Sequence, residues 1–359
     1  MFEFLNTWLA NGGFWVAIPL IVVGCAALIK GADFLVDGAS ALAKKYGVSD
    51  IVIGLTVVAF GTSMPEFVVN MVAVGQGSTE IAITNVLGSN IINIFVILGF
   101  TALIYPISSQ KSTRRFDIPF SLLAALLVLL FAVYNSPSWL QIEHIFNMNI
   151  AAPTLSDLGS IQMGQGNGGF ISGVGGSILL IFFLIFLWHN FKGIGSASQT
   201  ESNKEYKTMS ARRALALIIG GLVGLVVGGE VIVKSATSIA QSLGVSDAII
   251  GLTVVALGTS LPELATSCMA AFKKNCDIAL GNVIGSNLFN IFFILGTSAC
   301  VKALPGYHGL EIDAMMAALG SVLVMLFVYL TKKHEIKRWH GAILLLTYAA
   351  YLAYRIITL

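Results

Sequence analysis

The chain carries two copies of one segment, separated by 197 residues along the sequence. Residues 47–67 and 244–264 agree at 16 of 21 positions, and residues 85–99 and 282–296 agree at 11 of 15. Both blocks share this offset without a gap, so the chain consists of two halves built on one plan. Any fold for this chain must therefore accommodate these segments twice.

The repeated segments lie within a series of long apolar runs. Of the 359 residues, 56% are hydrophobic and only 11% are charged, and the mean hydropathy is +0.87. Soluble domains contain about 25% charged residues. Runs of about 20 apolar residues have the length of membrane-spanning helices and are too long for the strands of a membrane barrel. The composition predicts an all-α polytopic membrane protein in a lipid bilayer. A net charge of +2 with no basic patch predicts no nucleic-acid partner.

Ten transmembrane helices are predicted from the apolar runs. They cover residues 14–43, 51–74, 81–105, 116–134, 170–191, 211–242, 248–272, 278–303, 311–331 and 339–357. Each half holds five helices, and consecutive helices alternate in direction. Because five is odd, the second half enters the membrane upside down relative to the first. Such inverted-topology repeats are the plan of many secondary transporters, whose substrate site lies near mid-membrane between the halves. The first and sixth spans are long enough to tilt or to extend beyond the bilayer.

The basic residues predict the orientation and the domain organisation. Sixteen of the 20 Lys and Arg residues lie in five alternate loops, whereas the intervening loops hold only Lys302. Cytoplasmic loops are enriched in these residues, so we expect both termini outside the cytoplasm. The expected organisation is a first repeat with helices 1–4 in 1–134, an extracytoplasmic glycine-rich loop in 135–169, helix 5 in 170–191, a short cytoplasmic linker in 192–210, and a second repeat with helices 6–10 in 211–359.

Each half places a GTSxPE motif inside an apolar span, at residues 61–66 and 258–263. The proline of the motif has no backbone N–H, so the carbonyl group four residues earlier loses its helical partner. A freed carbonyl group in hydrocarbon is costly unless a donor or a cation satisfies it. The motif adds hydroxyl and carboxylate oxygens, from Thr62, Ser63 and Glu66 in the first half and from Thr259, Ser260 and Glu263 in the second. Hard oxygen ligands suit Ca²⁺ or Na⁺.

A second polar pattern lies on the following span of each half. Its members recur at every fourth residue and so share one face of a helix. They are Asn85, Ser89 and Asn93 in the first half, and Asn282, Ser286 and Asn290 in the second. Their amide and hydroxyl oxygens can complete a coordination shell without adding charge.

The two glutamates indicate which ion the site prefers. An ionised carboxylate at the bilayer centre costs at least ~2.5–3.5 kcal/mol, and two that face each other repel unless a cation or a shared proton lies between them. One Ca²⁺ neutralises Glu66 and Glu263 together. An empty site leaves the repulsion uncompensated. We therefore expect the site to switch its access from one side of the membrane to the other only when Ca²⁺, or Na⁺ or H⁺ in its place, is bound. This requirement is the physical basis of exchange.

Two other functions compete with exchange. A passive cation channel also needs carboxylates and carbonyl oxygens, but only an exchanger requires an opposing ion gradient. A membrane-embedded enzyme would need a base beside the serine of the motif, whereas all five histidines lie in loops or at helix ends. We therefore expect no enzymatic activity. The four cysteines show no CxxC spacing, and no disulfide framework is expected.

Several other charged residues lie in or beside the spans. Asp33 and Asp37 on the first span, and Glu230 and Lys234 on the sixth, have either a local pairing role or a gating role, and Glu230 and Lys234 have the spacing of a helical ion pair. Asp50 and Asp247 each follow a serine and precede an apolar run, which predicts a helix-capping role for both.

The two GTSxPE motifs, with the paired segments GSNIIN and GSNLFN, resemble the alpha-repeats of the calcium/cation antiporter superfamily, and specifically those of its prokaryotic sodium/calcium exchangers. The resemblance implies a calcium site formed by the carboxylates of Glu66 and Glu263 with the backbone carbonyl groups of Thr62 and Thr259. The sodium sites that it implies involve Ala59, Ser63, Ser89, Ala256, Thr259, Ser260 and Ser286, with Asn93 near the centre. It also implies that the first and sixth helices slide as a pair to alternate access.

One position departs from the pattern of that family. Many exchangers of the group carry an aspartate where this chain has Asn290, so both central positions are amides here. Proton-coupled members typically place an acidic residue in the segment that reads GNVIGSN in this chain, and none stands there. Sodium is therefore the expected counter-ion, with a proton as the alternative. We expect a monomer without a cofactor, in a prokaryotic inner or plasma membrane, that transports Ca²⁺ and Na⁺.

Overall fold

The computed structural model describes residues 3–134, 169–192, 209–244, 256–307 and 309–358, and helices account for most of them. The first half contains α1 (Glu3–Tyr46), α2 (Asp50–Ile53), η1 (Gly54–Val58), α3 (Ala59–Thr62), α4 (Met64–Gly75), α5 (Thr79–Ile92), η2 (Asn93–Ile97), α6 (Leu98–Ile104), α7 (Lys111–Arg115), α8 (Asp117–Tyr134) and α11 (Gly173–Lys192). The second half contains α12 (Ala211–Ser242), α14 (Ala256–Thr259), α15 (Leu261–Phe272), α16 (Cys276–Leu288), η4 (Phe289–Leu295), α17 (Gly296–Val301), α18 (Leu310–Leu330) and α19 (Arg338–Thr358). The elements labelled η are π-helical segments inside longer spans.

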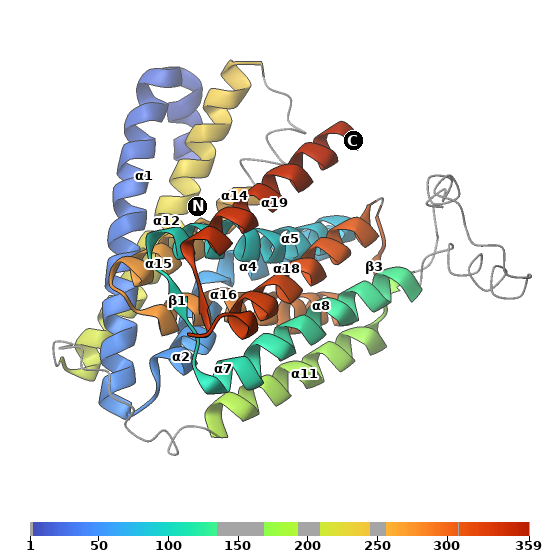
Figure 1. Ribbon diagram of the computed structural model, residues 1–359. Coiled ribbons are helices and arrows are strands. Elements are labelled where there is room, and N and C mark those ends of the chain that lie inside the picture. The colour runs from blue at the N-terminus through green and yellow to red at the C-terminus, as the bar shows by residue number, and fades with distance from the viewer. Residues whose placement is uncertain (1–2, 135–168, 193–208, 245–255, 308, 359) are drawn as a thin grey trace, which may run out of the picture.

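Helices α1 and α12 lie side by side at one edge of the molecule and run across the other helices (Figure 1). They have 44 and 32 residues, and about 20 suffice to cross a bilayer. Glycines let their backbones approach closely. A Cβ atom added to Gly31 would lie 2.7 Å from the carbonyl oxygen of Gly221, and one added to Gly221 would lie 2.7 Å from that of Gly31. Small residues at such an interface are the usual means by which membrane helices pack.

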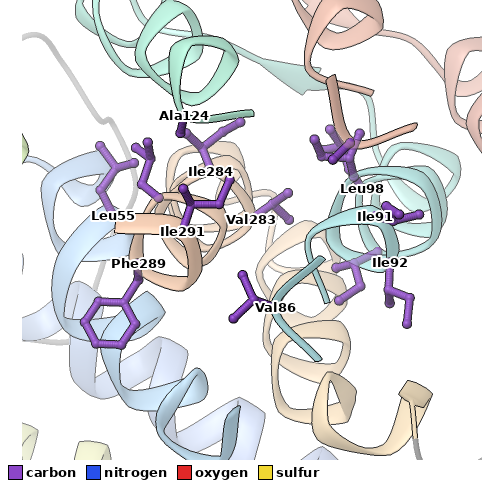
Figure 2. Close-up of a cluster of buried hydrophobic side chains, with 14 of the residues drawn as sticks. Leu55, Val86, Ile91, Ile92, Leu98, Ala124, Val283, Ile284, Phe289 and Ile291 are labelled. Carbon is purple, nitrogen blue, oxygen red and sulfur yellow. The ribbon is translucent and has the colours of Figure 1, made fainter. Parts of the chain in front are cut away.

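The spans of α5 and α16 form the centre of the remaining bundle and are the most buried of its long helices. Figure 2 shows apolar side chains from both spans packed together, among them Val86 and Val283, which are equivalent residues of the two repeats. Helix α16 also packs tightly on η1, because a Cβ atom at Gly285 would lie 2.6 Å from the carbonyl oxygen of Leu55. This close approach brings the polar face of α16 next to the GTSxPE motif of the first half.

Two short strand pairs link the loops at the two ends of the bundle. Strand β1 (Ile107–Ser108) pairs with β4 (Glu335–Ile336), and β2 (Gly169–Ile171) pairs with β3 (Leu304–Pro305), both antiparallel. Each pair joins two loops that the span count places on the same side of the membrane. The strands therefore agree with the predicted alternation of the helices.

All ten predicted spans are mainly helical where the structure describes them, with turns at Ser63 and Ser260 and with α11 beginning at Gly173 rather than at the predicted residue 170. Within the described ranges, eight helices are long and apolar enough to cross a membrane, and Asp50–Thr62 with Met64–Gly75 forms a further crossing that is bent by 45°. The tenth is the span predicted at 248–272, where α14 and α15 follow residues 245–255, which lie outside the described part. The predicted segments 135–169 and 192–210 lie almost wholly outside it too. The first helix begins at Glu3 rather than at the predicted residue 14.

The charged residues of the long helices form ion pairs. The Nζ atom of Lys234 lies 3.5 Å from Oε1 of Glu230, as their spacing predicted. Asp33 and Asp37 both contact Lys273, whose Nζ lies 2.6 Å from a carboxylate oxygen of each. These contacts connect α1 to the end of α15.

The capping role predicted for Asp50 is wrong. Ser49 occupies the capping position of α2, and the Asp50 carboxylate accepts a hydrogen bond of 2.8 Å from the side-chain amide of Asn275. Asp247, for which the same role was predicted, lies outside the described residues.

Candidate functional site

Both GTSxPE motifs form a break between two helices at their serine. Helix α3 ends at Thr62 and α4 begins at Met64, while α14 ends at Thr259 and α15 begins at Leu261. The two serines share nearly the same backbone angles, φ −84° and ψ 5° for Ser63 and φ −90° and ψ 4° for Ser260. Proline is favoured at the first turn of a helix, where its missing N–H has no intrahelical partner to lose. In each repeat the motif thus ends one helix and starts another at the equivalent serine.

Each break places a glutamate in the first turn of the helix that follows it. The first turn carries the positive end of the helix dipole, which stabilises a carboxylate. Glu66 and Glu263 are both only 1% exposed. Among the described residues, neither carboxyl group forms an ion pair with a lysine or arginine, so their charges are not balanced by a basic side chain.

The two carboxyl groups meet each other across the repeats, as the inverted plan predicts. The hydroxyl group of Ser63 donates a hydrogen bond of 2.9 Å to Oε1 of Glu263, and the hydroxyl groups of Thr259 and Ser260 lie beside the Glu66 carboxyl group. Each glutamate therefore lies next to the hydroxyl residues of the opposite repeat.

Buried oxygen atoms without a hydrogen-bond partner gather in this region. Among the described residues, thirteen buried side-chain atoms have no partner, and nine of them belong to residues that the sequence assigned to the ion site. They are Glu66 Oε1 and Oε2, Glu263 Oε2, Thr259 Oγ1, Ser260 Oγ, Ser89 Oγ, Ser286 Oγ, Asn93 Oδ1 and Asn290 Oδ1. Buried polar atoms in native proteins are almost always paired. A set of hard oxygens left over in one place matches the chemistry of a cation site.

Asn85 and Asn282, the first members of the two polar faces, form hydrogen bonds with the backbone of the two glutamates. Asn282 donates to the backbone carbonyl of Glu263 at 3.3 Å and accepts a hydrogen bond of 3.1 Å from the Thr62 hydroxyl group. Asn85 donates to the backbone carbonyl of Glu66 at 3.4 Å. A ligand role was open to both residues from the sequence, and the side-chain hydrogen bonds that both form are to the two motifs and to neighbouring polar side chains.

The two alanines assigned to sodium sites differ in how far the structure describes them. Ala59 is buried, and its carbonyl oxygen accepts hydrogen bonds from the Ser63 N–H at 3.0 Å and the Thr62 hydroxyl group at 3.3 Å. Ala256 begins α14, and its side chain lies outside the described part of the chain.

Asn90 and Asn287 are polar residues at this centre that the sequence analysis did not single out. Both are buried, and each forms hydrogen bonds with residues of the opposite repeat. The signal was present, because both belong to the GSN segments that recur at the common offset. Both residues lie outside the helical face on which polar residues recur at every fourth position, so that pattern did not identify them.

Ser63→Ala should weaken calcium binding by about tenfold. The variant leaves Glu263 Oε1 without its donor, and a hydrogen bond to a charged group is worth about 1.5–3 kcal/mol. The measurement is a calcium-binding isotherm of the purified protein. Ser321→Ala is the matched control, since Ser321 is also buried but its hydroxyl group bonds to the carbonyl of Ala317 on its own helix. Equal calcium affinity in Ser63→Ala and Ser321→Ala would contradict the assignment.

Comparison with known proteins places this arrangement in one family. The model of the family described as sodium/calcium exchanger protein matches residues 16–192 and 213–357. The sodium/calcium exchanger MaX1 of Methanosarcina acetivorans is 33% identical over 351 residues, covering 93% of this chain and 96% of its own. The inner membrane protein YrbG of Escherichia coli is 32% identical over 302 residues, with 84% and 82% covered.

Solved structures of the sodium-calcium exchanger NCX_Mj share the fold. One of them, soaked with 10 mM Na⁺ and no Ca²⁺, superposes with a TM-score of 0.74 at 32% identity, covering 94% of this chain and 98% of that one. The helical architecture in two inverted repeats and the multi-pass membrane location predicted from the sequence are confirmed by this similarity. The chain belongs to the sodium/calcium exchanger family, whose members are secondary active cation antiporters.

Proposed function

We propose that this protein exchanges Na⁺ for Ca²⁺ at one site near mid-membrane, which faces the two sides of the membrane in turn. The observation that carries the proposal is the set of nine buried oxygen atoms without a partner, three from the carboxyl groups of Glu66 and Glu263 and six from hydroxyl and amide groups. Ca²⁺ takes six to eight oxygen ligands, and this set can supply that number. The relatives named sodium/calcium exchangers support the choice of ions.

Glu66 and Glu263 are the calcium ligands in this proposal, together with the backbone carbonyl groups of Thr62 and Thr259. Those two residues end α3 and α14. The last carbonyl groups of a helix have no partner within it and are free to bind a cation. The helix breaks therefore provide ligands from the backbone at the same level as the carboxylates.

Sodium would use the neutral oxygens around the same centre. These are the hydroxyl groups of Ser63, Ser89, Thr259, Ser260 and Ser286, the amide oxygens of Asn93 and Asn290, and the carbonyl groups of Ala59 and Ala256. Several monovalent ions in place of Ca²⁺ again offset the two negative charges. An empty site leaves two carboxylates facing each other in a medium of low dielectric. Their repulsion disfavours switching of the site between the two sides of the membrane when no ion is bound.

One chain is enough to form this site, because both halves of the ligand set come from the same chain. We therefore propose that the transporting unit is a monomer. We also propose that both termini lie outside the cytoplasm, in an inner or plasma membrane, and the enrichment of Lys and Arg in alternate loops supports this orientation. The strand pairs β1–β4 and β2–β3 support the alternation on which this orientation depends.

Flux measurements on proteoliposomes distinguish Na⁺ exchange from the alternatives. Vesicles loaded with Na⁺ and diluted into sodium-free medium should take up Ca²⁺, and a sodium ionophore should stop the uptake. A proton gradient imposed without Na⁺ should drive no uptake. Uptake driven by protons alone would establish the proton-coupled alternative, and uptake without any opposing gradient would establish a channel.

A further inference from the structure

Four asparagines form a hydrogen-bonded network where α5 and α16 continue into the π-helical segments η2 and η4. They are Asn90, Asn93, Asn287 and Asn290, and each is 3% exposed or less. The side-chain amide of Asn290 donates to Oδ1 of Asn90 at 3.1 Å, and that of Asn93 donates to Oδ1 of Asn287 at 3.0 Å. Asn90 and Asn287 donate in turn to each other's backbone carbonyl group, at 3.3 and 3.4 Å.

The network crosses between the repeats in every one of these bonds. Asn90 of the first half holds Asn290 of the second, and Asn287 of the second half holds Asn93 of the first. The two supporting residues are equivalent in the repeat, and so are the two that they hold. The pattern therefore obeys the same twofold relation as the glutamates.

The bonds fix which way each amide group faces. Rotating the Asn90 side-chain amide by 180° would place its oxygen against the backbone carbonyl oxygen of Asn287. It would also place its nitrogen against the side-chain amide nitrogen of Asn290. An asparagine amide has two donors and one acceptor oxygen at opposite ends, so such a turn replaces two hydrogen bonds by two repulsive contacts. The amide oxygens of Asn93 and Asn290 are consequently directed away from the network, and both are buried without a partner.

These two free oxygens lie on the same helical faces as the free hydroxyl groups of Ser89 and Ser286, one turn away. π-helical segments begin at Asn93 and at Phe289, next to Asn290, and such segments are frequent at functional sites. We propose that Asn90 and Asn287 are positioning residues, which orient the amide oxygens of Asn290 and Asn93 toward the transported ion. This inference rests on the proposed function, because it deepens the description of the same ion site.

A double-mutant cycle separates positioning from a general structural role. Residues that act through a shared contact show non-additive effects, whereas independent residues are additive. Asn90→Ala should raise the KM for Na⁺ by about tenfold in the wild-type background, because the amide of Asn290, a proposed sodium ligand, loses its orientation. In the Asn290→Ala background the same change should raise the KM less than about twofold.

The comparison pair lies within one repeat. No direct side-chain bond joins Asn90 to Asn93 in the described structure, so Asn90→Ala should still raise the KM by about tenfold in the Asn93→Ala background. If Asn90→Ala does not yield folded protein, Asn287→Ala carries the same test, with Asn93 as its coupled partner and Asn290 as its comparison.

The outcomes of the cycle are distinct. Coupling of Asn90 with Asn290, and not with Asn93, supports the positioning role. An unchanged KM in Asn90→Ala, or the same tenfold rise in the Asn290→Ala background, overturns it. Sodium-driven uptake by the wild-type protein is measured alongside, and its absence would count against the proposed function itself.

Discussion

Glu66→Gln and Glu263→Gln should each reduce sodium-driven calcium uptake by at least about 100-fold. The substitution preserves the size of the side chain and removes one negative charge from the site. Two unit charges about 4 Å apart attract by about 4 kcal/mol at an effective dielectric constant near 20, and Ca²⁺ carries two charges. The loss therefore corresponds to several decades of affinity. The measurement is the initial rate of calcium uptake into proteoliposomes at equal protein content.

Glu80→Gln provides the matched control. Glu80 lies in the first turn of α5, as Glu66 lies in the first turn of α4, but its side chain is exposed. Glu80→Gln should transport calcium at the wild-type rate. Full activity in either buried variant would show that the site does not depend on the two carboxylates acting together.

Gly31→Ala should destabilise the protein by about 1–3 kcal/mol and reduce transport. The new methyl group would lie 2.7 Å from the carbonyl oxygen of Gly221. The other nearest atoms are also backbone, so no side-chain rotation can relieve the clash. Helices α1 and α12 would have to separate. The site would be affected as well, because α12 also packs on Gly61 through Leu222 and on Gly258 through Val233. The measurements are thermal unfolding in detergent and calcium uptake.

Gly220→Ala tests whether the close contact is responsible. Gly220 lies on α12, next to Gly221, but a Cβ atom added to it would meet nothing within 4 Å. Alanine is the better helix former, by about 0.5–1 kcal/mol, so this variant should be as stable as the wild type or slightly more so. A Gly31→Ala protein that unfolds at the wild-type temperature and transports normally would contradict the described packing of α1 on α12.

The helices and the helix breaks were predictable because their causes are local. Apolar runs of membrane length specify the spans, and a proline after GTS specifies where a helix is interrupted. The repeat then predicted that Glu66 and Glu263 meet, because an odd number of helices in each half inverts the second half. The structure places the Glu263 carboxyl group 2.9 Å from the hydroxyl group of Ser63, in the motif of the opposite repeat.

Contacts between the repeats were not predictable in the same way. Asn275 binds Asp50, and Lys273 binds Asp33 and Asp37, because the end of α15 lies against α1 and α2 in the folded molecule. The offset of 197 residues shows which positions are equivalent but not which positions touch. The crossed bonds of Asn90 and Asn287 depend on the register of α5 against α16, and no local pattern encodes it.

The central claim is that one cation lies between the carboxylates of the two inverted halves. Crystals grown with Ca²⁺ test it most directly, through an anomalous difference map that locates the calcium ion. We expect a single strong peak with an oxygen of Glu66 and an oxygen of Glu263 both within about 2.6 Å. A peak bound by only one of the two carboxylates, or one located away from both GTSxPE motifs, would contradict it.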